Sequence, residues 1–344
     1  MYNLKILIIG DFEKGNSNNF ILDGFSKHVD VCCKSQDDQG ELWSRRPSLY
    51  SRVRRRLGFP ADPKGHNVLL KAVAQSGEYQ VVIIIKGLHI KPSVLLAFKN
   101  KKVKLVSWSD DDMLNKSNQS FFYKKGLKYY DLVVTQKSFN ANMDELPALG
   151  ASQVLLLPKA YDPIIHKPKT ISAGDKRFIY DLVFIGHFEK ERFVSISFLV
   201  DHGLNVTIFG PGWSNVTSRP GLVIMNSILA AEDYAGAISQ SKISLGFLRK
   251  VNRDLHTGRT MEIPACGGFL LAERSSEHLS LFKEGTEAEF FDSDEELLKK
   301  ARFYLSNMDR RDKVAKNGCA RVTGENHTYE RRAEQILEVL YEKI

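Results

Sequence analysis

The chain has 344 residues, of which 43% are hydrophobic and 26% are charged, and its formal net charge is +8. This composition excludes a disordered or fibrous protein, and the length allows two domains with separate cores. The spacing of the four cysteines supports neither a disulfide framework nor a structural zinc site. The basic balance favours an anionic partner without identifying it.

Four continuous apolar runs in the first half predict strands, at residues 5–9, 81–85, 104–108 and 132–135. Such runs, without polar alternation, are typical of parallel strands covered on both faces. Helical patterns at residues 67–76 and 92–100 complete β-α-β units. After a linker around residues 165–177 the pattern restarts, with strands at 182–185, 205–209 and 243–248 and helices at 191–202 and 231–239. The chain is therefore predicted to form two doubly wound α/β halves.

A basic segment precedes the second predicted strand. Six arginines and no acidic residue occur between Trp43 and Arg56, and Leu49, Val53 and Leu57 recur at a spacing of four. The pattern predicts a basic amphipathic helix over Trp43–Leu57, which could lie on an anionic membrane surface. The alternative is a solvated arginine face above an ordinary core contact.

Residues 1–10 lack the charged region and long apolar run of a secretory signal, and no apolar stretch reaches the length of a membrane span. We expect a cytoplasmic protein, which could also work at the inner face of the membrane.

The most informative segment lies between the apolar run 243–248 and a second one at 269–272. A polar loop at 249–259 leads into a short helix that should begin near Thr260, where free N–H groups and the helix dipole favour an anion. Arg259 and Glu262 lie three residues apart, so one turn can direct a cation at a phosphate and a carboxylate at sugar hydroxyls. Alternatively, the two pair on the surface and Gly267 merely ends the helix.

Residues 259–271, Arg-Thr-Met-Glu-Ile-Pro-Ala-Cys-Gly-Gly-Phe-Leu-Leu, closely resemble the donor-site motif of the group 1 glycosyltransferases, especially their spore-maturation (CgeB-like) branch. Residues 273–297 and 321–332 look like the rest of that family's C-terminal module, and residues 180–187 and 206–213 like its opening strands. The first half is similar more weakly, at residues 108–112, 130–135 and 161–163.

The resemblance implies the GT-B fold, with two Rossmann-like doubly wound domains that face a cleft. Residues 1–165 would form the acceptor-side domain and residues 178–328 the domain that binds the nucleotide sugar. A helix at 329–344 would return to brace the N-terminal domain, although it could instead cap the second one.

The resemblance also implies roles for individual residues. Glu262 would bind the nucleotide ribose, and Asp254 would contact the transferred sugar, unless it only caps a turn; the family has Glu at that position, and a one-residue slip would place Arg253 or Leu255 there. The remaining candidate donor-binding residues surround the diphosphate and the base: Gly10, Gly186, His187, Lys190, Arg192, Gly210, Trp213, Arg259, Gly267 and Gly268. Lys190 and Arg192 could neutralise the leaving pyrophosphate, and Gly210–Trp213 would form the nucleobase wall, or else a tight turn beside a half-buried Trp.

In the first half, Asp111 or Asp112 could take the proton from the acceptor hydroxyl, and His89 is a candidate base or sugar contact. An Asp-x-Asp sequence is also the metal signature of the other main glycosyltransferase fold, and three acids in a row often only cap a helix. Because the donor motif lies in the second half, we expect no metal and leave retention or inversion of configuration open.

The leading hypothesis is a glycosyltransferase that moves a sugar from a nucleoside-diphosphate sugar to an acceptor hydroxyl in cell-surface or envelope glycan synthesis. The acceptor would be a glycan, a lipid-linked molecule or a protein. The alternatives are a nucleic-acid-binding or nucleic-acid-modifying protein that uses the arginines, and a catalytically inactive donor-binding relative. A dinucleotide-dependent enzyme is disfavoured because Ile8–Gly15 is not Gly-x-Gly-x-x-Gly.

Overall fold

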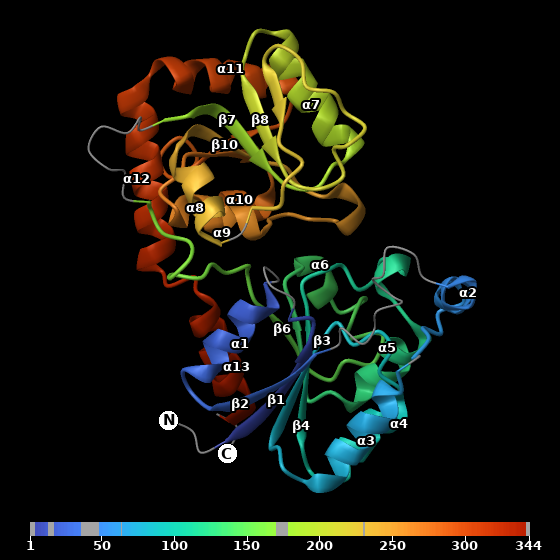
Figure 1. Ribbon diagram of the computed structural model, residues 1–344. Coiled ribbons are helices and arrows are strands. Elements are labelled where there is room, and N and C mark those ends of the chain that lie inside the picture. Colours follow the sequence, from blue (N-terminus) through green and yellow to red (C-terminus); the bar gives the residue numbers. More distant parts are fainter. Residues whose placement is uncertain are drawn as a thin grey trace. The chain divides into compact units, whose positions relative to one another are not determined.

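The computed structural model describes residues 4–12, 17–35, 48–62, 64–169, 178–229 and 231–341 (Figure 1). Its contacts divide the chain into two compact units. Unit 1 consists of Met1–Pro158, Val251–Arg253 and Tyr329–Ile344, and unit 2 of Lys159–Lys250 and Asp254–Thr328. Of the polar loop at residues 249–259, residues 251–253 therefore belong to unit 1 and the others to unit 2.

Unit 1 is built on a six-stranded parallel sheet. In sheet order its strands are β2 (Asp30–Ser35), β1 (Lys5–Gly10), β3 (Val81–Ile85), β4 (Lys104–Ser109), β5 (Leu132–Thr135) and β6 (Val154–Leu156). The four apolar runs form the central strands, and Ile6–Ile9 and Val81–Ile84 have no more than 1% of their side-chain surface exposed. The expected parallel sheet is confirmed. The short edge strand β6 was not predicted, although Val154–Leu157 is a run of four apolar residues; its first two residues are half-buried and its third is exposed.

The helices of unit 1 cover both faces of this sheet (Figure 1). They are α1 (Asn18–Ser26), α2 (Leu49–Arg56), α3 (His66–Ser76), α4 (Pro92–Lys99), α5 (Phe121–Gly126), α6 (Ser138–Ala141) and α13 (Tyr329–Tyr341), with 3-10 turns at Lys116–Asn118 and Leu127–Tyr129. Helices α3 and α4 pack on one face, and α1 with α13 on the other.

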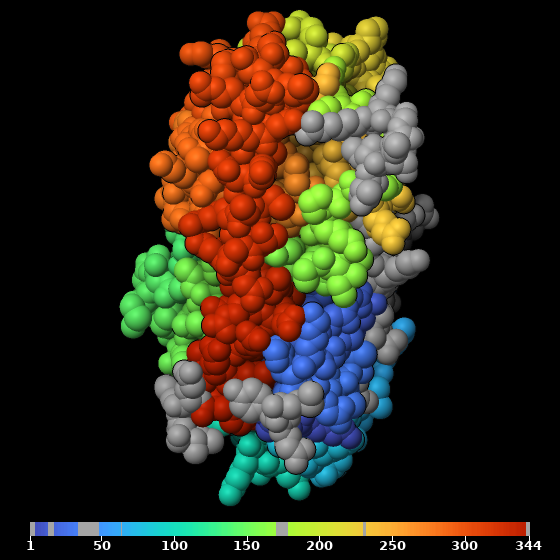
Figure 2. Space-filling view, turned by 90° about the vertical axis from the view of Figure 1, so that its left-hand side faces the viewer, coloured from blue at the N-terminus to red at the C-terminus, as the bar shows by residue number. Residues whose placement is uncertain are grey.

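The C-terminal helix α13 belongs to unit 1, so the prediction that it returns to the N-terminal domain is confirmed. Its stripe Ala333, Ile336, Leu337 and Leu340 is buried, and the helix runs beside α1 (Figure 2). At Gly24 of α1 an added Cβ would lie 2.8 Å from the carbonyl oxygen of Tyr329, so only glycine allows this close approach.

Unit 2 repeats the architecture with a second six-stranded parallel sheet. In sheet order its strands are β12 (Glu289–Phe291), β11 (Leu270–Glu273), β10 (Ser241–Gly246), β7 (Tyr180–Ile185), β8 (Val206–Phe209) and β9 (Leu222–Ile224). Its helices are α7 (Lys190–Asp201), α8 (Ala231–Ser239), α9 (Gly258–Ala265), α10 (Ser276–Leu281), α11 (Asp294–Ser306) and α12 (Met308–Gly324), and a 3-10 turn spans Lys250–Asn252.

Among the boundaries in unit 2 that differ from the predictions, two lie beside the predicted site. Strand β10 ends at Gly246, because Phe247 and Leu248 leave the ladder and the Leu248 N–H donates to the Glu273 carboxylate instead. Helix α9 begins at Gly258 rather than near Thr260, because Thr257 and Thr260 cap its first turn reciprocally.

Three predicted segments fall partly outside the described residues: residues 170–177 of the linker, 43–47 of the basic segment and 342–344 of the C-terminal helix. The described part of the basic segment is helical from Leu49 to Arg56, as predicted. None of the helices in the described ranges is long and apolar enough to cross a membrane.

Candidate functional site

The carboxyl-terminal edge of the sheet in unit 2 carries a cluster of basic side chains. His187 follows β7 and lies close to three arginines. They are Arg192 at the start of α7, Arg249 in the loop after β10, and Arg259 at the start of α9. Partial burial, followed by the electrostatic effect of these three arginines, lowers the pKa of His187 below its ordinary value. A site with this charge is suited to an anion, and the amino end of α9 adds N–H groups to it.

Arg192 is the most enclosed member of the cluster, with 11% of its side chain exposed. One of its terminal nitrogens donates to the carbonyl oxygen of His187 at 3.1 Å, and its guanidinium lies 5.8 Å from the ring of Phe184. Its Nε atom is buried and has no hydrogen-bond partner among the described residues. Burial, Arg259 and Arg249 lower the pKa of Arg192, although the neighbouring Glu189 opposes this. A buried donor among like charges would be stabilised by a bound anion.

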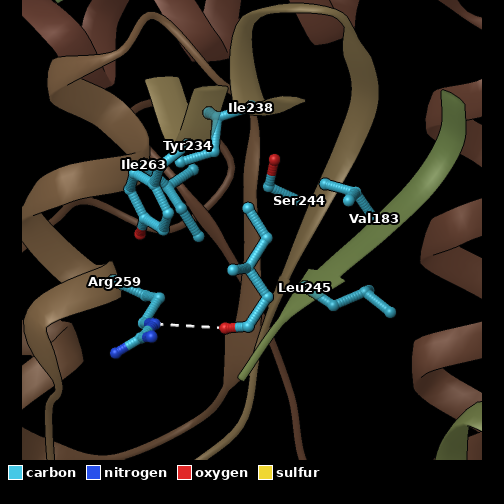
Figure 3. Close-up of a pocket in the computed structure, with 8 residues that line it drawn as sticks. Val183, Tyr234, Ile238, Ser244, Leu245, Arg259 and Ile263 are labelled. Carbon is cyan, nitrogen blue, oxygen red and sulfur yellow. Dashed lines mark hydrogen bonds between the residues drawn. The ribbon is translucent and has the colours of Figure 1, made fainter. Parts of the chain in front are cut away.

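Arg259 is the second residue of α9, and its Nε donates to the carbonyl oxygen of Ile185, the last residue of β7, at 3.2 Å (Figure 3). The bond anchors the base of the guanidinium. Behind it, Arg259, Tyr234 and Ile263 line a small cavity of about 10 Å³, which can hold one water molecule at most. This cavity is too small for a nucleotide.

Glu262 lies one turn further along α9. Its carboxylate accepts a hydrogen bond of 2.6 Å from the hydroxyl of Tyr234 in α8. Burial and the charge of Glu262 raise the pKa of Tyr234 well above its ordinary value, so the phenol stays protonated and donates. An added Cβ at Gly258 would lie 2.7 Å from the second carboxylate oxygen, so glycine leaves that oxygen room.

Asp254 belongs to the same edge. It is half-buried, its N–H donates to the carbonyl oxygen of Arg249 at 3.2 Å, and its charge acts on Arg192. Unit 2 therefore brings together five predicted residues: His187, Arg192, Asp254, Arg259 and Glu262. Lys190 is exposed at the first position of α7.

Trp213 does not form a nucleobase wall. Its side chain is fully buried, the indole N–H donates to the carbonyl oxygen of Gly186 at 2.9 Å, and Phe184 and Phe188 surround the ring. At Gly210, where φ is +131°, an added Cβ would lie 2.2 Å from the same carbonyl oxygen. Gly186, Gly210 and Trp213 thus join the ends of β7 and β8, and the prediction of a ligand contact for Trp213 is wrong because the ring belongs to the core.

Gly267 and Gly268 lie at the carboxyl end of α9, away from its anion-binding end. Gly267 has φ of +73° and ends the helix, as the alternative interpretation proposed. At Gly268 an added Cβ would lie 2.4 Å from the side chain of Ile238. Their predicted role in donor binding is corrected to helix termination and close packing.

In unit 1, Asp112 is buried and occupied by other groups. Arg253 donates to both of its carboxylate oxygens, at 2.7 and 2.8 Å, and Asn140 donates at 2.9 Å. Although burial disfavours the charge, these bonds hold the pKa of Asp112 below its ordinary value. Arg253 also binds Glu145, so Asp112 anchors this arginine and is not suited to the predicted role of base.

Asp111 is the better candidate for proton transfer, because 17% of its side chain is exposed at the carboxyl end of β4. Lys86, which follows β3, pairs with Asp111 at 2.5 Å and with Asp110 at 3.8 Å. Gly10 ends β1 at the same edge of this sheet, where an added Cβ would lie 3.0 Å from Ile85.

His89 is 1% exposed, so it is neither a surface residue nor a group that can reach a substrate. Burial, followed by the charge of His66, lowers the pKa of His89 to about 4, and neither ring nitrogen has a hydrogen-bond partner among the described residues. The predicted role as a base or sugar contact is therefore corrected to that of a neutral core side chain.

Three residues of these sites were not predicted, Tyr234, Arg249 and Glu189, and Arg253 was named only as an alternative to Asp254. Glu189 accepts a hydrogen bond of 2.9 Å from Arg249 and so orients it. Arg249 directly follows a predicted strand, which is a signal for the edge of a parallel sheet. Tyr234 lies inside an ordinary amphipathic helix, where no local signal distinguishes it.

Residues 193–338 match a family model described as "Glycosyl transferase-like". The structure is similar to Anabaena HepE in complex with UDP and glucose, with 13% identity, a TM-score of 0.66, and coverage of 99% of this chain and 100% of that chain. Sucrose-phosphate synthase from Thermosynechococcus elongatus is 12% identical, with a TM-score of 0.69 and coverage of 99% of both chains. A glycosyltransferase from Rickettsia africae is 10% identical, with a TM-score of 0.67 and coverage of 99% of both chains.

A search of curated protein sequences finds no match. The similar structures establish the GT-B fold for the two sheets, and the family match covers α8 and α9, which carry Tyr234, Arg259 and Glu262. Residues 193–338 are thus glycosyltransferase-like, within a chain that has the GT-B fold.

Proposed function

We propose that this protein moves a sugar from a nucleoside-diphosphate sugar to an acceptor hydroxyl, with the donor bound by unit 2. The observation that carries the proposal is the cluster of Arg192, Arg249 and Arg259 around His187, next to a carboxylate on the same helix as Arg259. In a nucleoside-diphosphate sugar, the two phosphates would interact with the arginines, and the hydroxyls of a flanking sugar would donate to the carboxylate.

During transfer, the bond between the anomeric carbon and the diphosphate oxygen breaks, and its electron pair stays on the diphosphate. The arginines and the amino end of α9 would stabilise the charge that develops there. Glu262, held by Tyr234, would accept hydrogen bonds from the ribose hydroxyls. Asp254 would contact the transferred sugar.

The acceptor oxygen forms the new bond to the anomeric carbon and loses its proton. Asp111 in unit 1 is the carboxylate that we propose for this step. Because the basic side chains can neutralise the diphosphate, the proposed mechanism uses no metal, which turnover in excess chelator will check.

HepE has been solved with UDP and with UDP-glucose, so uridine nucleotides are the first donors to test. We also propose that the chain belongs to the spore-maturation branch of these enzymes, which residues 259–271 resemble most closely.

We further propose that the acceptor is presented at an anionic membrane surface, in synthesis of a cell-surface or envelope glycan. Helix α2 supports this, because its apolar residues do not pack on the core: Leu49, Val53 and Leu57 are 72%, 49% and 68% exposed. Arg52, Arg55 and Arg56 are exposed on the same helix. An exposed apolar stripe flanked by arginines is typical of helices that lie on anionic lipid.

The proposal is tested with purified protein, a panel of nucleoside-diphosphate sugars, and the variants Arg259→Ala and Glu262→Gln. Each variant should lose transfer and weaken UDP binding by tenfold or more in calorimetry, because a hydrogen bond to a charged group contributes about 1.5–3 kcal/mol. Arg219→Ala is the matched control, since Arg219 pairs with Asp201 at the carboxyl end of α7, away from the site. Wild-type turnover by either site variant would refute the donor-site assignment.

A further inference from the structure

Three potential metal ligands meet where α1 ends against α13, in unit 1. His28 follows α1, and Glu330 and Glu334 lie one turn apart on α13. One ligand atom from each lies within 4.8 Å of the others. His28 Nε2 is 3.9 Å from Glu330 Oε1 and 3.6 Å from Glu334 Oε1.

Direct contacts do not satisfy the imidazole. Both of these distances are too long for a hydrogen bond, and His28 Nε2 is a buried atom without a hydrogen-bond partner among the described residues. The side chains of His28, Glu330 and Glu334 are 21%, 35% and 34% exposed, so the site would open to solvent on the side of the glutamates.

The two carboxylates are already oriented. Glu330 Oε2 binds Lys27 at 2.5 Å and Glu334 Oε2 binds Arg331 at 2.9 Å, which leaves the Oε1 atom of each on the side of His28. Second contacts of this kind hold the ligands of metal sites in place. The helices are rigidly packed here, through Gly24 against Tyr329 and a contact of 5.6 Å between the rings of Phe20 and Tyr329.

We propose that His28, Glu330 and Glu334 bind Zn²⁺, with water in the fourth position, and that the ion fastens α1 to α13. Tetrahedral zinc with bonds of about 2.0–2.1 Å to nitrogen and oxygen places its ligand atoms roughly 3.3–3.5 Å apart. The two distances from His28 Nε2, 3.9 and 3.6 Å, are close to this spacing, and side-chain rotation must bring the two carboxylates, whose ligand atoms lie within 4.8 Å of one another, to it as well. Two carboxylates balance the charge of the ion, and an imidazole favours Zn²⁺ over Mg²⁺. Lys27 and Arg331 repel the ion, so we expect a dissociation constant in the micromolar range, on the order of 10⁻⁶ M.

The experiment is isothermal titration of Zn²⁺ into the full-length, chelator-treated protein at pH 7.5. The wild type should bind one equivalent tightly, and His28→Ala and Glu334→Gln should each weaken this binding by about tenfold or more, whereas Mg²⁺ should not compete. Glu338→Gln is the matched control, because Arg331 binds Glu338 at 2.8 Å one turn further along α13, outside the three-ligand group. Zinc should also raise the melting temperature of the wild type and the control, and not that of the two ligand variants.

Glu334→Gln preserves the shape of the side chain, so this variant should fold, which circular dichroism will check. It therefore tests the proposal even if His28→Ala fails to fold. Unchanged zinc affinity in Glu334→Gln would overturn the proposal. Absence of zinc binding in the wild type would also overturn it.

Discussion

Repulsion among the arginines at the edge of β7 and β10 is the main electrostatic feature at the scale of single residues. Arg192, Arg249 and Arg259 act on one another and on His187, and Glu189 compensates them only in part. A protein keeps such a cluster at a cost in stability, which an anionic ligand offsets. Diphosphate binding is the use that we propose for this arrangement.

A substitution at Trp213 can test whether this side chain stabilises the core or contacts the ligand. Trp213→Phe should lower the free energy of unfolding by roughly 1–3 kcal/mol, because the buried carbonyl of Gly186 loses its donor, while the dissociation constant of UDP changes little. Urea unfolding and calorimetry measure the two quantities. A tenfold loss of UDP affinity with unaltered stability would instead restore Trp213 to the ligand site.

The buried His89 should make the free energy of unfolding depend on pH. Its pKa is about 4 in the folded protein, against about 6.5 for an unfolded histidine, so only the unfolded chain binds a proton as the pH falls from 6.5 to 4. The stabilising contribution is fully present above pH 6.5 and decreases below it, by about 3 kcal/mol at pH 4.

Replacement of His89 by leucine should remove this loss and flatten the curve of unfolding free energy between pH 6.5 and 4. His278 in unit 2, also with a pKa of about 4, will maintain a second, similar loss. His202→Leu, at an exposed position, is the control. Equal curves for His89→Leu and the wild type would show that His89 binds its proton in the folded state.

At the scale of elements, α2 differs from the other helices of unit 1 because its apolar stripe faces solvent. Val53→Ser with Leu57→Ser should release the protein from vesicles that contain anionic lipid, because these residues supply the surface that a bilayer buries. Co-sedimentation measures the bound fraction. Val194→Ser, at an exposed position of α7 in unit 2, is the control for the loss of an exposed valine.

The arginines of α2 should act together. Each basic residue near an anionic bilayer contributes about 1 kcal/mol, so changing Arg52, Arg55 and Arg56 to Gln should weaken vesicle binding by about 100-fold. Arg54 is left unchanged, because its Nε donates to the carbonyl oxygen of Phe59 at 3.1 Å. An unmodified protein that ignores anionic vesicles would end the membrane proposal, and loss of nucleic-acid binding in the arginine variant alone would favour a nucleic-acid partner.

At the scale of the whole molecule, each unit has its own apolar core. One core surrounds Leu7, Val82 and Leu105, and another surrounds Leu182, Ile208 and Leu245. Scanning calorimetry should therefore resolve two transitions, and UDP should raise only that of unit 2. At a concentration 100 times its dissociation constant, UDP adds about 2.7 kcal/mol of stability, and Arg259→Ala should abolish the shift. A single transition, or a shift of both, would contradict this prediction.

The amino-acid sequence by itself determined the two parallel sheets and the place of the donor helix. A parallel strand that is buried on both faces, such as Val81–Ile85, needs an apolar residue at every position. The resulting apolar run is contiguous in the sequence, so it can be recognised locally. Arg259 and Glu262 were predicted for the same reason, since one helical turn sets their spacing. The short edge strand β6 was missed although Val154–Leu157 is a continuous apolar run, because a run this short does not by itself distinguish a strand from another apolar segment.

Only the tertiary structure decided which polar groups have their hydrogen-bonding capacity used inside the fold. Asp111 and Asp112 are neighbours in the sequence, yet the buried Asp112 is held by Arg253, whereas Asp111 pairs with Lys86 and is 17% exposed. His89 and Trp213 were placed in sites from their positions after strands, but packing from distant segments buries both. Burial and partner choice depend on residues far apart in the chain, so local pattern cannot report them, and the meeting of His28 with α13 across some 300 positions has the same origin.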